Sequence, residues 1–215
     1  MRTLIGLLVV LCLNSSPTAA DSSCGSFQAS VAPPPLELAP PAGFVEICSR
    51  DTALCAKLAS GYPPTAKTVG YFVTSQEWDQ YREGRLSGFT RYLIAQVSEG
   101  TAPSEFPDLK NFIRSQQGVI PDNTELSPVF DAVGRSNIGV FEDSETAISS
   151  GVVMKLQPAT SGPPADLILA SANTAFLTKG RVLSLYAFTD VTAKPSAEPV
   201  KQLTREWLKC LRSAK

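Results

Sequence analysis

Residues 166–188, DLILASANTAFLTKGRVLSLYAF, decide the fold class of this 215-residue chain. Two runs of mostly apolar residues, 166–177 and 181–188, flank the dipeptide Lys179-Gly180. Runs of this kind favour β-strands, and a short link that contains glycine joins neighbouring strands in a hairpin. The stretch therefore predicts two long antiparallel strands joined by a tight turn.

The residues before this hairpin extend it into an antiparallel meander. Residues 151–156 (GVVMKL) predict a third strand, and the turn residues 161–164 (SGPP) connect it to the hairpin. Between 118 and 146 the pattern weakens, and we expect loops there around one short strand at 138–141.

The preceding part of the chain alternates strands with helices. Residues 67–73 (KTVGYFV) predict a strand, and Thr74 with Glu77 has the capping-box spacing of a helix that should stop at Gly84. A further strand is predicted at 89–97. Ser104 is the expected cap of an amphipathic helix through residue 117, and its apolar face is Phe106, Leu109, Phe112 and Ile113.

A helix is also predicted at 198–212, with Ser196 as its cap. Its apolar residues recur at helical spacing and should face the core: Val200, Leu203, Trp207, Cys210 and Leu211. The predicted fold class is α/β (α+β), with an antiparallel β-sheet flanked by helices.

The first 20 residues are typical of a cleavable secretory signal. Arg2 supplies the positive charge, residues 4–13 are apolar, and Thr18-Ala19-Ala20 offers the small residues of a peptidase site. Ten apolar residues are too few to span a membrane, which needs roughly 20. We therefore expect a periplasmic or secreted protein with no integral membrane segment after cleavage.

The predicted domain organisation follows from this signal and from proline content. Residues 1–20 are the signal peptide, 21–43 form a Pro-rich extended lead-in with little ability to pack, and 44–215 form a single globular α/β domain. Within the lead-in, Leu36-Glu37-Leu38 is a candidate edge strand, and the folded body should begin between Leu36 and Phe44.

Four cysteines remain once Cys12 leaves with the signal, an even number that favours two disulfides in an oxidising compartment. Cys48 and Cys55 could meet at a strand-to-helix corner, which leaves Cys24 and Cys210 to join the two ends of the chain. The alternative is that some of these thiols are buried and free.

Charge and motif content exclude several classes of function. Lysine and arginine number 19 against 20 acidic residues, and loss of Arg2 makes this 18 against 20, or −2, so no electrostatic preference for nucleic acid is expected. The chain has no histidine, which excludes Ser-His-Asp and Cys-His catalysis and histidine-ligated zinc. It also lacks Ser-x-x-Lys, G-x-S-x-G, P-loop and G-x-G-x-x-G motifs. We predict no catalytic residue, metal site or cofactor.

Two groups of residues are weaker candidates for a site. Glu142, Asp143 and Glu145 could bind a hard cation, but their spacing differs from that of calcium loops, and a solvated acidic loop is the competing interpretation. Four aromatic residues could line a ligand groove or could belong to the core: Tyr71, Trp78, Tyr81 and Tyr92.

The order of these segments resembles a known fold family. A Leu-x-Leu-x-Pro-Pro-x-Gly-Phe opening at 36–44 precedes the strand-and-helix half. The meander that follows ends in 179–186 (KGRVLSLY), before a loop and a helix that carries Trp207. This pattern resembles the PsbP/DcrB-like proteins, which include the extrinsic P subunit of photosystem II, the nuclear-import Ran-binding factor and exported bacterial proteins. The resemblance implies an α/β/α sandwich and a binding or accessory role, and it transfers no functional residue.

These observations favour a non-catalytic binding or accessory protein of the bacterial cell envelope, with an unknown protein or small molecule as its partner. One alternative is a hydrolase that works through acidic residues. Another is a structural stabiliser of an envelope assembly.

Overall fold

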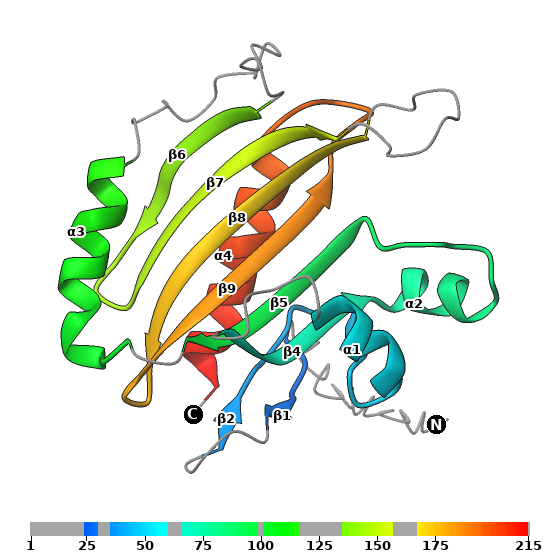
Figure 1. The fold of residues 1–215 in the computed structure, drawn as a ribbon, viewed down its shortest axis with the longest axis horizontal. Coiled ribbons are helices and arrows are strands. Elements are labelled where there is room, and N and C mark those ends of the chain that lie inside the picture. The colour runs from blue at the N-terminus through cyan, green and yellow to red at the C-terminus, as the bar shows by residue number, and fades with distance from the viewer. Residues whose placement is uncertain are drawn as a thin grey trace, which may run out of the picture.

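The computed structural model describes residues 24–29, 35–59, 66–98, 101–116, 135–156 and 167–214. Within these residues the centre is a seven-stranded antiparallel sheet in the order β3-β4-β5-β9-β8-β7-β6 (Figure 1). Its strands are β3 Phe44–Glu46, β4 Ala66–Thr74, β5 Arg91–Ser98, β6 Arg135–Asp143, β7 Ala147–Leu156, β8 Leu167–Thr178 and β9 Arg181–Asp190. The predicted α+β class with an antiparallel sheet is confirmed.

The hairpin that decided the fold class is regular. β8 and β9 pair in unbroken register from Leu169↔Asp190 to Thr178↔Arg181. Lys179 and Gly180 both have positive φ, 44° and 71°, as a two-residue type I′ turn requires. The expected turn at 161–164 lies outside the described residues.

Two strands are longer than predicted. β6 covers Arg135–Asp143 where only 138–141 was expected, and β7 begins at Ala147 instead of at residue 151. The sequence hides the start of β7 because Ser149 is polar yet fully buried. Its hydroxyl hydrogen-bonds the hydroxyl of Thr174 on β8 at 2.7 Å, which removes the cost of burying both groups.

Four helices accompany the sheet within the described residues: α1 Thr52–Ala59, α2 Ser75–Arg82, α3 Phe106–Gln116 and α4 Glu198–Ser213. α2 begins as predicted, because the backbone N–H of Glu77 donates to Thr74 Oγ1 at 3.2 Å and the Thr74 hydroxyl donates to the Glu77 carboxylate at 3.0 Å. At the start of α4, the backbone N–H of Glu198 donates to Ser196 Oγ at 3.2 Å.

The helix predicted from Ser104 starts later and is less one-sided than expected. A 3-10 turn, Pro103–Glu105, precedes α3, and Glu105 accepts the backbone N–H of Ala102 at 3.2 Å. If Ser104 were the N-cap, Pro107 would be the third residue of the helix. Its backbone has no N–H that could donate to the Ser104 hydroxyl, so Ser104 is a poor cap. Phe112 was assigned to the apolar face, but it is 61% exposed.

α4 covers one face of the sheet. Its buried residues pack on the side chains of β5, β8 and β9 that point to this face, and the helix lies behind these strands in Figure 1. These buried residues include the predicted ones: Val200, Leu203, Trp207, Cys210 and Leu211.

The Pro-rich segment completes the same face, contrary to the expectation that it packs little. Ala29, Leu36 and Leu38 are buried in one cluster with Phe72 and α4. β1 Gln28–Ala29 and β2 Leu36–Glu37 pair with each other in a separate two-stranded sheet, and Gly25 N–H donates to the Pro40 carbonyl at 2.7 Å. The packed part of the chain thus begins before Leu36.

The opposite face is covered in two places. Along β4, Phe72 points toward α4, while its neighbours Tyr71 and Val73 belong to a second cluster with Ile47 and Trp78 under α1 and α2. At the far side of the sheet, Phe106 of α3 packs in a third cluster with residues of β7, β8 and β9: Ile148, Ala175 and Val182.

Both predicted disulfides are present: Cys24–Cys210 and Cys48–Cys55, with Cα separations of 5.5 and 4.9 Å. The alternative of free thiols is therefore wrong. The corner after β3 places Cys48 because its backbone N–H donates to the Glu46 carboxylate at 2.9 Å. None of the described helices is long and apolar enough to cross a lipid bilayer. The expected signal at 1–20 lies outside the described residues.

The two disulfides should contribute unequally to stability. Loop-closure entropy grows with the number of enclosed residues, and the sequence separations are 186 and 7. We expect replacement of Cys24 and Cys210 by alanine to lower the free energy of unfolding by roughly 5 kcal/mol, against roughly 2.5 kcal/mol for Cys48 and Cys55. Urea unfolding of the two double variants measures both losses, and equal losses would contradict the end-to-end assignment.

The close packing around Gly151 of β7 predicts that a larger residue at this position destabilises the fold. A Cβ on Gly151 would lie 2.6 Å from Ile138 Cδ1 and would also collide with the Ser171 carbonyl oxygen. We expect Gly151→Ala to lower the free energy of unfolding by about 2 kcal/mol. Gly88→Ala is the matched control, since a Cβ there meets no atom within 4 Å. Equal denaturation midpoints for the two variants would refute this account of the packing.

Candidate functional site

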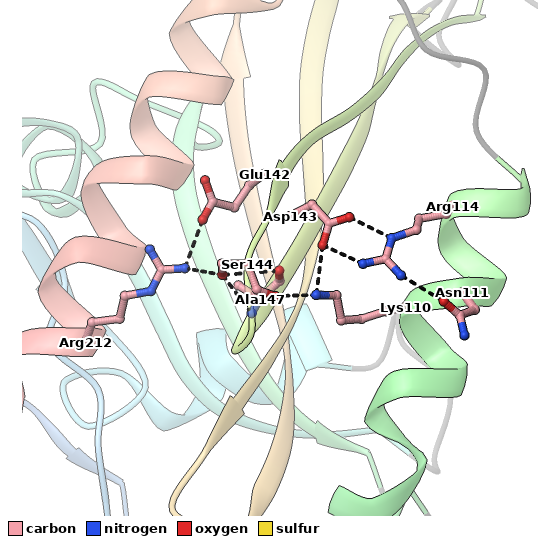
Figure 2. Close-up of polar contacts among 8 residues, drawn as sticks. All are labelled: Lys110, Asn111, Arg114, Glu142, Asp143, Ser144, Ala147 and Arg212. Atoms are coloured by element: carbon pink, nitrogen blue, oxygen red, sulfur yellow. Dashed lines mark hydrogen bonds and ion pairs between the residues drawn. The ribbon is translucent and has the colours of Figure 1, made fainter.

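The corner between β6 and β7 gathers charged side chains from three elements (Figure 2). Asp143 ends β6 on the face that α3 covers, and Glu142, one residue earlier, interacts with α4. This division follows from strand geometry, because consecutive residues point to opposite faces. Two adjacent carboxylates therefore reach helices on different sides of the sheet.

Asp143 holds two cations of α3. Arg114 donates through Nε to Oδ2 at 2.6 Å and through Nη2 to Oδ1 at 2.8 Å, and Lys110 Nζ lies 2.8 Å from Oδ1. Lys110 Nζ also donates to the Ser144 carbonyl oxygen. The hydrogen bonds from Arg114, aided by Lys110 and opposed by desolvation, lower the pKa of Asp143 to about 2. This carboxylate is ionised throughout the neutral range.

α4 reaches the same corner from the other side of the sheet. Arg212 Nη2 donates to Glu142 Oε1 at 2.9 Å and to Ser144 Oγ at 2.8 Å. About two helical turns earlier, Arg205 donates to the Phe141 carbonyl at 3.3 Å. We call Lys110, Arg114, Glu142, Asp143, Ser144 and Arg212 the charged corner. It fixes the β6–β7 turn between the two helices.

A hollow of about 280 Å³ opens beside this corner. It is lined by Phe106, Pro107, Lys110, Asn111 and Arg114 of α3 and by Glu145 of the β6–β7 turn. Arg114 Nη1 donates to Asn111 Oδ1 at 2.8 Å, so this arginine is fixed at three points. Among the described residues, the Glu145 carboxylate has no hydrogen-bond or ion-pair partner. We call this cavity the α3 hollow.

Two other hollows are less suited to orient a ligand. One of about 350 Å³ lies at Cys210, where Lys209 is exposed and has no fixing contact among the described residues. The other, of about 200 Å³, contains Glu46, whose carboxylate is already occupied by the backbone N–H groups of Cys48 and Ser49. The α3 hollow combines fixed cations with a carboxylate that no described residue pairs with.

Neither interpretation of the acidic residues at 142–145, a hard-cation site or a solvated loop, describes Glu142 and Asp143. Glu142 and Asp143 belong to β6 and are paired with cations, so they form neither a solvated loop nor a hard-cation site. Only Glu145 is an exposed turn residue. Within the described ranges, no group of three or more acidic or cysteine side chains is placed to hold a metal ion.

The four candidate groove aromatics lie together in the cluster under α1 and α2. Tyr71 stacks on Tyr92 with ring centroids 5.5 Å apart, and Trp78 stacks on Tyr81 at 5.9 Å. Tyr71 and Trp78 are buried, and the other two are half-buried. None of the four lines the α3 hollow.

The basic residues of the site were missed by the sequence analysis. Lys110 and Arg114 stand four residues apart on the predicted helix, a spacing that places two side chains on one face. Together with the acidic segment 142–145, this spacing could have predicted ion pairs between the helix and that segment. Arg212, in the last turn of α4, had no comparable signal. Its partner Glu142 is 70 residues away.

Comparison with protein-family models finds no match, and comparison with curated proteins finds none. The function must therefore be argued from the geometry described above.

The lowered pKa of Asp143 predicts how stability changes in acid. Folding lowers the pKa of the Asp143 carboxyl from its ordinary value of 3.8 to about 2. Such a group stabilises the folded state fully at pH values well above 3.8, and this contribution to the free energy of unfolding is lost as the pH falls toward 2. Because Asp143 is one-third exposed, we expect Asp143→Asn to cost about 1 kcal/mol at pH 7 and much less at pH 2.

Urea unfolding at pH 7, 4 and 2 measures this difference. Asp79→Asn removes an exposed carboxylate of α2 that has no side-chain partner among the described residues, and it serves as the matched control. A loss from Asp143→Asn that stays constant across this range would show that the ion pairs contribute nothing.

Proposed function

We propose that this chain is a non-catalytic binding or accessory protein of the bacterial cell envelope, exported to the periplasm or secreted. The observation that carries the proposal is the α3 hollow, which is lined by an arginine fixed at three points and by a carboxylate, that of Glu145, with no partner among the residues the structure describes. Charged groups held in place before a ligand arrives reduce the entropy cost of binding it. This arrangement suits recognition.

The same geometry disfavours the hydrolase alternative at this site. A carboxylate-dependent hydrolase needs a carboxyl group with a raised pKa, which donates a proton, near a second carboxylate. The pKa of Asp143 is shifted in the opposite direction, to about 2. Counting the residues that the structure describes, each of the three hollows above is lined by a single carboxylate: Glu145, Glu206 or Glu46.

The compartment is supported by the cysteines and by the signal-like first 20 residues. Two disulfides form readily in oxidising spaces and are rare in the bacterial cytoplasm. The α/β/α sandwich of the PsbP/DcrB-like proteins is part of the same proposal. Helices on both faces of an antiparallel sheet support it.

Photo-crosslinking of the exported chain tests the proposal. A photoreactive amino acid replaces Pro107, an exposed residue that lines the α3 hollow, or Asp79 on α2 as control, in full-length protein produced in a Gram-negative host. We expect protein from the periplasmic fraction to begin after Ala20 and to carry an adduct at position 107 that is absent at position 79. Intact-mass analysis detects small-molecule and protein adducts alike.

Two results would contradict the proposal. The first is a cytosolic protein that retains Met1. The second is the absence of any adduct specific to position 107.

A further inference from the structure

The α3 hollow has opposite charges on its two sides. Lys110 and Arg114 supply two positive charges on α3, and Glu145 supplies a negative charge on the β6–β7 turn. Asp143, which binds both cations from the sheet, adds a second negative charge. Because Asp143 lies in contact with both cations, the α3 side keeps one net positive charge, and the negative charge of Glu145 on the opposite side brings the local sum to zero.

The cations keep hydrogen-bonding capacity after the internal contacts are made. A guanidinium has five N–H donors, and Arg114 uses one each on Nε, Nη1 and Nη2, which leaves two. The Asn111 side chain accepts from Arg114 through Oδ1, so its NH₂ group remains available. A carboxylate could thus be bound on the α3 side without breaking the charged corner.

Glu145 makes the β6–β7 side of the hollow negatively charged. It is exposed in the turn and has no partner within the described part of the chain, so its carboxylate can accept hydrogen bonds from an ammonium group. Phe106 and Pro107 form the apolar part of the lining. A volume of about 280 Å³ is large enough to hold a small molecule.

We propose that the α3 hollow binds a small zwitterion, a free amino acid with an apolar side chain. Its carboxylate binds the remaining donors of Arg114 and Asn111, and its ammonium group binds Glu145. A zwitterion matches a cavity whose charges are separated but sum to zero, whereas a simple anion or cation would leave one side unpaired. This inference rests on the proposed binding function and specifies its ligand class.

Calorimetric titration of the full mature chain with three probes tests the assignment. L-leucine carries both charges, N-acetyl-L-leucine lacks the ammonium, and L-leucinamide lacks the carboxylate. We expect L-leucine to bind at millimolar or lower concentration and each single-charge probe to bind about tenfold more weakly, as loss of a charge-assisted hydrogen bond implies.

Two variants assign the two ends of the ligand. Glu145→Gln should weaken L-leucine about tenfold and leave N-acetyl-L-leucine unchanged. Asn111→Asp keeps the oxygen that accepts from Arg114 but adds a negative charge, so it should weaken both carboxylate-bearing probes and spare L-leucinamide. Asp79→Asn on α2 is the charge-matched control for Glu145→Gln.

Failure of L-leucine to bind, or equal weakening of L-leucine and N-acetyl-L-leucine by Glu145→Gln, would overturn the zwitterion assignment. Neither result removes an adduct at position 107 in the crosslinking experiment, so that experiment tests the binding function independently of the ligand class.

Discussion

The alternation of side chains along the central strands is the constraint on which the rest of this structure depends. Both faces of β4, β5 and β9 are apolar, so both must be covered. Phe72 requires α4 and the N-terminal strands on one side, and its neighbours Tyr71 and Val73 require α1 and α2 on the other. The same alternation separates Glu142 from Asp143 at the end of β6 and directs them to different helices.

Much of the fold was predictable because local signals agreed with the tertiary structure. Lys179-Gly180 defines a hairpin through backbone conformation alone, and Thr74 with Glu77 defines a helix start through two hydrogen bonds. The misjudged elements depended on partners distant in sequence. Ser149 is acceptable in a buried strand only because Thr174 lies opposite, and Leu36 and Leu38 are buried only because the Pro-rich segment is held against the core.

The site was less predictable than the fold for the same reason. Glu142 and Asp143 were noticed as acidic residues, but their role is set by Arg212 and Arg114, which no local pattern connects to them. Paired with these arginines, they hold the β6–β7 turn, whereas Glu145 has no partner in the described part of the chain. The arrangement places a rigid basic helix face and one unpaired acid around a small cavity, and our functional proposals rest on that separation of charge.

The nesting of the two disulfides has a consequence for biogenesis. Cys24 bonds the last cysteine, Cys210, and encloses the pair Cys48–Cys55. On the export route that we propose, a chain that crosses the membrane N-terminus first presents Cys24 to oxidants long before Cys210 arrives, and pairing by order of emergence would join Cys24 to Cys48. Correct maturation then requires either delayed oxidation of Cys24 or later shuffling of a wrong bond, the task of thiol isomerases.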